Sequence, residues 1–324
     1  MSVVEIENLT KDFAVGFWKK RPVRALDQLN LKVNEGEIFG FLGPNGAGKS
    51  TTIKLLMSLL HPTSGSARIM GRPVGSIAMH QDIGYLPENP YFYDYLTPEE
   101  LLNYAGKLFG LGGEELARRT RALIEDVGLG HAANRQLRKF SKGMVQRLGI
   151  AQAIINEPKT VFLDEPMSGL DPLGRMDVRR IILSLKARGV TVFFSSHILP
   201  DVEAICDRVA ILNRGKLQES GTLAEILKAG TGYEIIVAGD MSEVSDSVRN
   251  LCKEVHSIGE RLHLRVSDKE RMEEVIRFIL ERKMELLSVN PIRPSLEEHF
   301  QSTVFGTGTN DGTALKYQPS TISD

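Results

Sequence analysis

The chain has 324 residues and a formal net charge of -1 at pH 7. This length suggests one large domain or two domains, and the near-zero charge excludes a strong overall field for nucleic acid or anionic lipid. No apolar run approaches the roughly 18–20 residues of a membrane-spanning helix, and residues 1–7 lack the regions of a signal peptide. Cys206 and Cys252 lie far apart, outside any metal-ligand spacing, so we expect small core residues on helical faces in a reducing compartment.

The most informative stretch is the glycine-rich loop GPNGAGKST at residues 43–51. A short apolar strand is expected before it, at residues 36–42, and an apolar-periodic helix after it, at residues 52–60. In this context the pattern G-x-x-x-x-G-K-[ST] predicts a phosphate-binding loop, because its glycines allow backbone N–H groups to surround a phosphate. The following helix N-terminus adds partial positive charge. The alternative is a glycine-rich turn that binds nothing.

Several residues of this loop are predicted to contact a nucleotide. They are Gly43, Asn45, Gly46, Gly48, Lys49, Ser50 and Thr51. In such loops the lysine reaches the β- and γ-phosphates and the hydroxyl that follows it binds Mg²⁺, so Lys49 and Ser50 are given these roles. ATP and Mg²⁺ are therefore the predicted ligands.

The rest of the first 232 residues alternates strands with helices, which predicts a largely parallel sheet covered on both faces. Strands are expected at residues 3–10, 26–33, 66–70, 83–86, 159–165 and 191–195. Helices are expected at residues 97–109, 114–127, 141–156, 177–187 and 199–206. The helix-rich stretch at about 88–157 is interpreted as a helical subdomain inserted between strands.

A smaller unit is predicted at residues 233–305. Strands are expected at residues 233–237, 261–266 and 286–289, and helices at residues 242–254, after 267 and after 295. We interpret the order as β-α-β-β-α-β, the split βαβ arrangement of a ferredoxin-like α+β fold. Its histidines, His256, His263 and His299, are scattered in sequence, which favours surface or packing roles over metal binding. Residues 306–324 are polar without periodicity and are expected to be a disordered tail.

Further motifs outside the glycine-rich loop contain candidate functional residues. Asp164 ends an apolar run and is placed to hold Mg²⁺, and Glu165 beside it can activate an attacking water as a general base. The alternative is that both acids cap the next turn. Ser141 can cap a helix whose N-terminal N–H groups are open to an anion, and His197 follows a strand at the sheet edge where ligands bind.

These motifs, in this order along residues 1–230, resemble the ATP-binding cassette family of ATPases. The resemblance implies an α/β P-loop NTPase fold, with Phe13 stacking on adenine and Glu165 acting as catalytic base. It further implies that Glu88 is the mobile-loop residue that contacts Mg²⁺ and the attacking water, and that His197 contacts the γ-phosphate.

The resemblance also implies a dimer. In this family a signature loop, here Ser141, Gly143 and Met144, closes on the γ-phosphate held by a second cassette, and Asp171 crosses the dimer interface. A homodimer driven by ATP is expected, and a heterodimer is the alternative.

Two positions depart from the family pattern. Glu88 stands where glutamine is usual, so the loop can still ligate Mg²⁺ but carries an extra negative charge beside the γ-phosphate. The signature reads Phe-Ser-Lys-Gly-Met at residues 140–144 instead of Leu-Ser-Gly-Gly-Gln. Because of these two departures and the small C-terminal domain, the chain resembles a bacterial subgroup of the family. This subgroup contains the ATPase subunits of ABC-2 type exporters, such as the daunorubicin-exporter kind.

As such a subunit, the protein would act on the cytoplasmic face of the membrane beside a separate integral membrane permease. Tyr91, Phe92, Tyr93 and Tyr95 follow Glu88 closely, where this family receives a short permease helix. Exposed aromatic side chains are typical interface anchors. The alternative is that they pack within the helical subdomain.

A second hypothesis is a soluble, non-transport cassette ATPase that acts on nucleic acid or ribosomes. Translation-type members carry two cassettes in one chain, and this chain has one phosphate loop. Repair-type members insert a long coiled coil before the signature, and no heptad run lies between Lys49 and Ser141. The near-zero charge also argues against a nucleic-acid partner. The C-terminal unit is expected to stabilise the dimer or to regulate the cassette.

Overall fold

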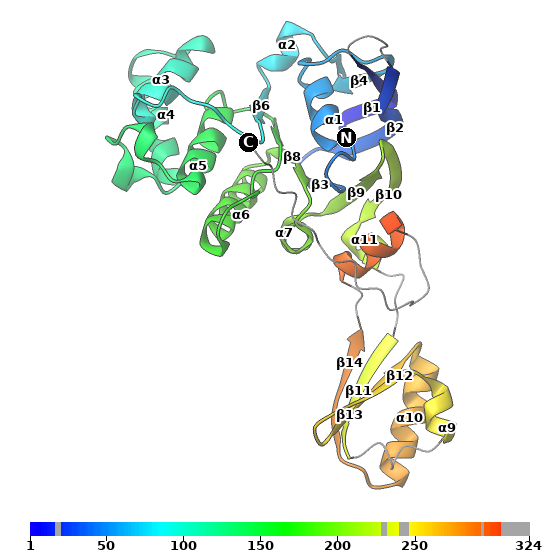
Figure 1. The fold of residues 1–324 in the computed structure, drawn as a ribbon. Helices are drawn as coiled ribbons and strands as arrows, with labels where there is room; N and C mark the ends of the chain where they lie inside the picture. Colours follow the sequence, from blue (N-terminus) through cyan, green and yellow to red (C-terminus); the bar gives the residue numbers. More distant parts are fainter. Residues whose placement is uncertain (17–20, 228–231, 240–245, 293–294, 306–324) are drawn as a thin grey trace.

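The computed structural model describes residues 1–16, 21–227, 232–239, 246–292 and 295–305. Two sheets and their helices form the larger part of this chain, and a third, smaller sheet lies apart from them (Figure 1). The tail predicted at residues 306–324 falls outside the described residues. In the part of the chain that is described, no helix combines the length and apolarity needed to cross a membrane.

A six-stranded sheet lies at the centre of the larger part, in the order β10-β9-β3-β8-β7-β6. Its strands are β3 (Ile38–Leu42), β6 (Ile83–Leu86), β7 (Thr160–Leu163), β8 (Thr191–Ser196), β9 (Arg208–Asn213) and β10 (Lys216–Thr222). All neighbours pair in parallel except β9 and β10. Strands β3, β7 and β8 are buried at every position, because both faces of the sheet are covered.

A four-stranded antiparallel sheet, ordered β2-β1-β4-β5, packs beside the central one. Its strands are β1 (Ser2–Val15), β2 (Arg21–Asn34), β4 (Ser64–Ile69) and β5 (Arg72–Pro73). The first two strands are longer than predicted, since Phe13 pairs with Val23 and Val15 with Arg21. Backbone pairing in a hairpin continues where the side chains are exposed and the apolar alternation has stopped.

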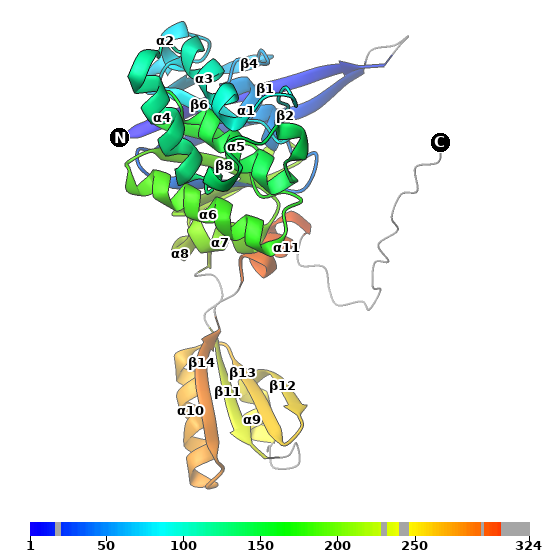
Figure 2. The same ribbon diagram turned by 90° about the vertical axis from the view of Figure 1, so that its left-hand side faces the viewer.

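Helices cover both faces of the central sheet. They are α1 (Lys49–Leu56), α2 (Ile77–His80), α3 (Pro98–Leu108), α4 (Gly113–Asp126), α5 (Lys142–Ala153), α6 (Pro172–Ala187), α7 (Leu199–Ile205) and α8 (Leu223–Ile226). Between β6 and β7 the regular structure is helical, and α3, α4 and α5 pack together there (Figure 2). Helix α6 begins five residues before the predicted start at 177, because Asp171 caps it and Pro172 fits its first turn.

The C-terminal sheet is antiparallel, with the order β12-β13-β11-β14. Its elements are β11 (Gly232–Ala238), α9 (Asp246–Leu251), β12 (Cys252–Ile258), β13 (Arg261–Val266), α10 (Lys269–Glu281) and β14 (Leu286–Ile292). The helix predicted at 242–254 was wrong at its end, because residues 252–258 form β12. There Val255 pairs with Leu264, so sheet pairing overrides the helical spacing of the apolar residues. Cys252 therefore begins a strand, whereas Cys206 is buried at the end of α7.

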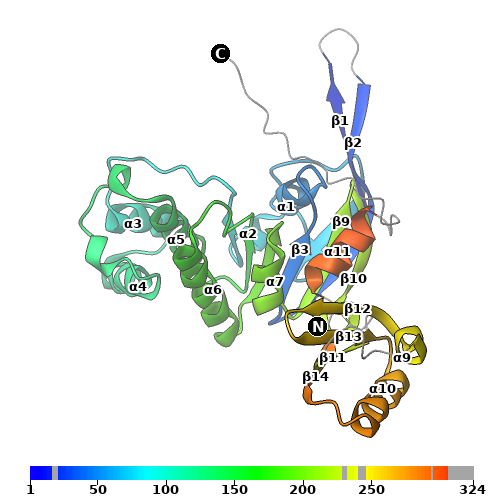
Figure 3. The same ribbon diagram turned by 60° about the horizontal axis from the view of Figure 1, so that its bottom comes forward.

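The last helix, α11 (Leu296–Phe305), packs against α7 in the larger part of the chain (Figure 3). Leu296 is fully buried in the core that also contains Val202 of α7. Its backbone N–H donates to the Glu203 carboxylate at 3.3 Å, and the Asn213 side chain donates to the Val304 carbonyl at 3.1 Å. The prediction assigned this helix to the small unit at 233–305, whereas the helix packs against the larger part of the chain. The reason is that a helix docks where its apolar face can be buried.

Replacing Leu296 with alanine is expected to destabilise the larger part of the chain by roughly 2–5 kcal/mol, the usual cost of a cavity at a fully buried leucine. Urea unfolding of the full chain measures the effect. Leu280→Ala, at an exposed position of α10, is the matched control and should change stability by less than about 0.5 kcal/mol. Equal effects of the two substitutions would show that α11 is not docked.

Candidate active site

Three neighbouring parallel strands carry the candidate active site at their carboxyl ends. The phosphate loop follows β3, Asp164 and Glu165 follow β7, and His197 follows β8. Because β8 lies between β3 and β7, these segments meet at one edge of the sheet. Residues that are far apart in sequence are thereby brought together.

Lys49 lies at the centre of this cluster. Its ammonium donates to the Gly43 carbonyl at 2.7 Å and lies 3.1 Å from Glu165 Oε1. Each of these two charged side chains is only 6% exposed. The lysine therefore joins the loop after β3 to the carboxylate after β7.

Two glycines of the loop, Gly43 and Gly48, are required by close backbone contacts. A Cβ atom on Gly43 would lie 2.5 Å from the Leu212 carbonyl oxygen, and one on Gly48 would lie 2.6 Å from the Ala25 carbonyl oxygen. Gly48 has a φ of 108° and precedes α1 without a side-chain cap, so the first N–H groups of the helix stay open to an anion. This arrangement fits the predicted phosphate cradle.

Asp164 is buried and receives two hydroxyl hydrogen bonds on one oxygen. Ser50 Oγ donates to Asp164 Oδ1 at 3.0 Å, and Ser195 Oγ donates to the same atom at 2.7 Å. A hydroxyl and a carboxylate that converge in this way are ligands that suit a hard cation such as Mg²⁺. Ser50 and Asp164 thus fit the metal-binding role predicted for them.

Ser195 belongs to the same cluster, although the sequence did not predict a role for it. Besides its bond to Asp164, its hydroxyl accepts the backbone N–H of Glu165 at 2.8 Å. It therefore links the Asp164 carboxylate to the Glu165 backbone. One feature of the sequence could have indicated this role. Ser195 is a hydroxyl residue near the end of a buried strand, and that strand pairs with the strand that precedes the two acids.

Glu165 uses both carboxylate oxygens. Oε1 faces Lys49, and Oε2 lies 2.8 Å from His197 Nδ1, whose side chain is 42% exposed. The backbone φ of Glu165 is 49°, in the left-handed region that is uncommon for a residue with a Cβ. Nearby, burial and the charge of Asp164 raise the pKa of the Tyr85 phenol to about 12, so this hydroxyl stays protonated.

The predicted signature and interface residues form a second group. Ser141 caps α5 by accepting the Met144 N–H at 3.3 Å, and Asp171 caps α6 by accepting the Gly174 N–H at 2.8 Å. Gly143 lies close to Leu170, so the two loops adjoin each other. In the described chain none of these residues hydrogen-bonds to the cluster around Lys49.

The remaining predicted residues are partly or fully exposed. Phe13, in β1, is partly exposed, and the Lys11 ammonium lies 5.1 Å from the centre of its ring. Glu88 follows β6 and is exposed. Of the aromatic residues after it, Tyr91 is 91% exposed, whereas Phe92 packs against the core. This segment therefore presents tyrosines to solvent and anchors itself by one phenylalanine.

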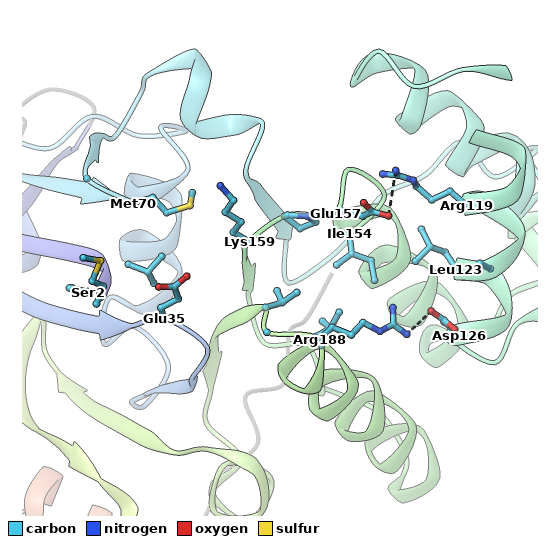
Figure 4. A pocket seen from close by; sticks show the side chains of 18 of the residues that line it. Ser2, Glu35, Met70, Arg119, Leu123, Asp126, Ile154, Glu157, Lys159 and Arg188 are labelled. Carbon is cyan, nitrogen blue, oxygen red and sulfur yellow. Dashed lines mark hydrogen bonds and ion pairs between the residues drawn. The ribbon is translucent and has the colours of Figure 1, made fainter. Parts of the chain in front are cut away.

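A separate cavity of about 870 Å³ lies at the opposite, amino-terminal end of the parallel strands (Figure 4). Four cations line it, and each pairs with a carboxylate: Arg118, Arg119, Lys159 and Arg188. The pairs Arg119–Glu157, at 3.4 Å, and Arg188–Asp126, at 2.7 Å, connect α4 to the ends of α5 and α6. The cavity is therefore distinct from the candidate active site.

Comparisons with known proteins agree with this geometry. The family model described as ABC transporter matches residues 26–168. An uncharacterized ABC transporter ATP-binding protein of Synechocystis sp. is 47% identical over 307 residues, which cover 92% of this chain and 84% of that protein. The bacitracin transport ATP-binding protein of Bacillus licheniformis is 35% identical over 291 residues, covering 87% of this chain and 93% of that protein.

A solved structure shows the same fold. It is a dimeric ATP-binding cassette in a post-hydrolysis state, bound to ADP and Pi. It is 25% identical to this chain with a TM-score of 0.62, and the match covers 68% of this chain and 98% of that one.

Replacing Ser195 with alanine is expected to cost roughly 1–3 kcal/mol of stability, because the buried Glu165 N–H loses its acceptor. Urea unfolding measures this loss, and Ser66→Ala, at an exposed position of β4, serves as the control. If the two variants were equally stable, the bridging role of Ser195 would be refuted.

Proposed function

We propose that this chain, which belongs to the ABC transporter family, is the ATP-binding and ATP-hydrolysing subunit of an ABC-2 type membrane exporter. The observation that carries the proposal is the meeting of Lys49, Ser50, Asp164 and Glu165 at one edge of the sheet. A phosphate-binding loop, a pair of oxygen ligands and a carboxylate base are the components that nucleotide hydrolysis requires.

In the proposed mode of binding, the loop N–H groups and the Lys49 ammonium hold the β- and γ-phosphates. Phe13 stacks on the adenine. Ser50 and Asp164 would hold Mg²⁺, with Glu88 as a further proposed ligand, and the ion would supply positive charge to balance the phosphates. The open N-terminus of α1 and the hydroxyl–carboxylate pair support these assignments.

The proposed hydrolysis depends on a change of partner for Lys49. When Lys49 moves onto the phosphates, Glu165 Oε1 loses the cation now 3.1 Å away and can accept a proton from the attacking water. His197 holds the other carboxylate oxygen through Nδ1, which leaves its second ring nitrogen for the γ-phosphate.

Each site is proposed to be completed by a second copy. In the described residues, Ser141, Gly143, Met144 and Asp171 make no hydrogen bond to the Lys49 cluster of their own chain. Ser141 lies at the N-terminus of α5, where the partial positive charge of the helix favours an anion. The dimeric cassette bound to ADP and Pi supports such an assembly. A homodimer is proposed, and a heterodimer with a related chain is the alternative.

The exporter assignment rests on resemblance and on the relative that transports bacitracin. The membrane permease is proposed to be a separate subunit that docks near Tyr91–Tyr95, at the cytoplasmic face of the membrane. The exposure of Tyr91, Tyr93 and Tyr95 supports this contact. Nothing in the described surface favours the alternative of a nucleic-acid or ribosome partner.

The C-terminal unit is proposed to be a ferredoxin-like domain with a dimerising or regulatory role. The sheet order β12-β13-β11-β14, with α9 and α10 packed with it, supports this fold. The segment at 88–157 is likewise proposed to be the helical subdomain of the cassette.

The substitution Glu165→Gln is expected to slow ATP hydrolysis by roughly 10²–10⁴-fold, because the amide cannot accept the proton of water. Phosphate release measures turnover, and gel filtration with ATP should show a trapped dimer. Glu114→Gln, at an exposed position of α4, is the control. Turnover near the wild-type rate would require another base.

Replacing Tyr91 or Tyr95 with alanine is expected to weaken the recovery of the permease with the tagged subunit several-fold, while ATP binding is retained. Co-purification from detergent-solubilised membranes measures the contact. Ile77→Ala, at an exposed position of α2, is the control for loss of apolar surface. Unchanged recovery for both tyrosine variants would refute this docking site.

A further inference from the structure

The two edges of the C-terminal sheet differ in their ability to accept another strand. The outer edge of β14 contains Pro291, which has no N–H group and is a common device against edge pairing. The other edge strand, β12, has seven residues and no proline. In the described chain no strand pairs with its outer side (Figure 2).

We propose that the outer edge of β12 pairs antiparallel with the same edge of a second copy of this chain, around a two-fold axis at Val255. The two C-terminal sheets would then form one continuous sheet. This interface needs no nucleotide, so it goes beyond the ATP-dependent closure proposed above, and it gives the dimerising role of the C-terminal unit a physical basis. A self-complementary surface of this kind closes a two-fold dimer without leaving a free end.

The alternation of side chains along β12 limits the registers of such a pair. Glu254 and His256 point to the open face, opposite Arg265 and His263, whereas Val255 points to the helix-covered face, opposite Leu264. In a continuous sheet the open faces of the two copies must lie on the same side, so directly opposite residues must point to the same face. The axis must therefore pass through a residue and not between two residues.

Charge selects among the three central registers. An axis at Glu254 would place that carboxylate opposite its own copy, which is destabilising. An axis at His256 would place two imidazoles together and leave Glu254 opposite an apolar residue. An axis at Val255 places Glu254 opposite the partner's His256 twice, and it joins the two valines on the apolar face. Of the three registers, only the axis at Val255 pairs Glu254 with His256 on the open face and valine with valine on the apolar face.

Contacts within the chain already orient the polar side chains of the seam. Arg265 Nη1 donates to Glu254 Oε2 at 3.1 Å, and His256 Nε2 lies 3.5 Å from the same oxygen. Ile258, which is 65% exposed, lies at the end of the strand. A bulge between Cys252 and Glu254 limits the regular part to residues 254–258. The seam is therefore short, and its association should depend on concentration.

The first test is the association of the nucleotide-free full chain, measured by sedimentation velocity over a range of concentrations. His256→Glu places like charges opposite each other at two points of the seam and should weaken the dimer at least about tenfold. Asn290→Glu adds the same charge to the other edge, on β14, and should leave association unchanged. A wild-type monomer at all concentrations, or equal behaviour of the two variants, would overturn the proposal.

A cysteine variant tests the register. Directly opposite residues of antiparallel strands have Cα atoms about 4.5–5.5 Å apart, within disulfide range. In a Cys252→Ser background, Val255→Cys should therefore form a covalent dimer under mild oxidation without ATP. Leu287→Cys, on β14, is the matched control and should stay monomeric. Equal cross-linking of both would exclude the β12 seam.

The outcome is separate from that of the proposed function. His256→Glu should retain hydrolysis that depends on Glu165, because β12 lies outside the cassette. Absence of hydrolysis in the wild-type chain would refute the ATPase role and leave the sedimentation result standing.

Discussion

The buried ion pair between Lys49 and Glu165 is the interaction on which the candidate site depends. Burying two opposite charges is costly, and the cost is offset only when hydrogen bonds satisfy the remaining donors and acceptors. Here the Gly43 carbonyl accepts a hydrogen bond from the lysine ammonium, and His197 hydrogen-bonds to the second carboxylate oxygen of the glutamate. Removal of either charge would leave the other uncompensated, at a cost of about 3–5 kcal/mol.

This pair also explains why binding and chemistry would be coupled. The phosphates of a nucleotide are the natural replacement for Glu165 as the counter-ion of Lys49, because they carry more charge and reach the open N-terminus of α1. In the proposed mechanism, the step that positions the substrate therefore also frees Glu165 to act as the base. Ser195 holds Asp164 and the Glu165 backbone in place throughout.

Much of the site could be predicted from the sequence, because its motifs are local. The phosphate loop, Asp164, Glu165 and His197 each lie at the end of a short apolar run, and parallel strands bring such ends together. The Lys49–Glu165 pair and the bridge through Ser195 were not predicted, because they depend on which strands are neighbours. Strand β12 and the docking of α11 were missed for the same reason, since tertiary contacts override local spacing.

The central claim, that two copies share each hydrolytic site, is tested most directly by mixing two inactive variants. Lys49→Ala removes the phosphate ligand and Ser141→Ala removes the loop that completes the other copy's site. We expect each variant alone to be nearly inactive, and a mixture to regain ATP hydrolysis from the one intact site of each mixed dimer. A mixture no more active than its components, or full activity of Ser141→Ala alone, would contradict the account.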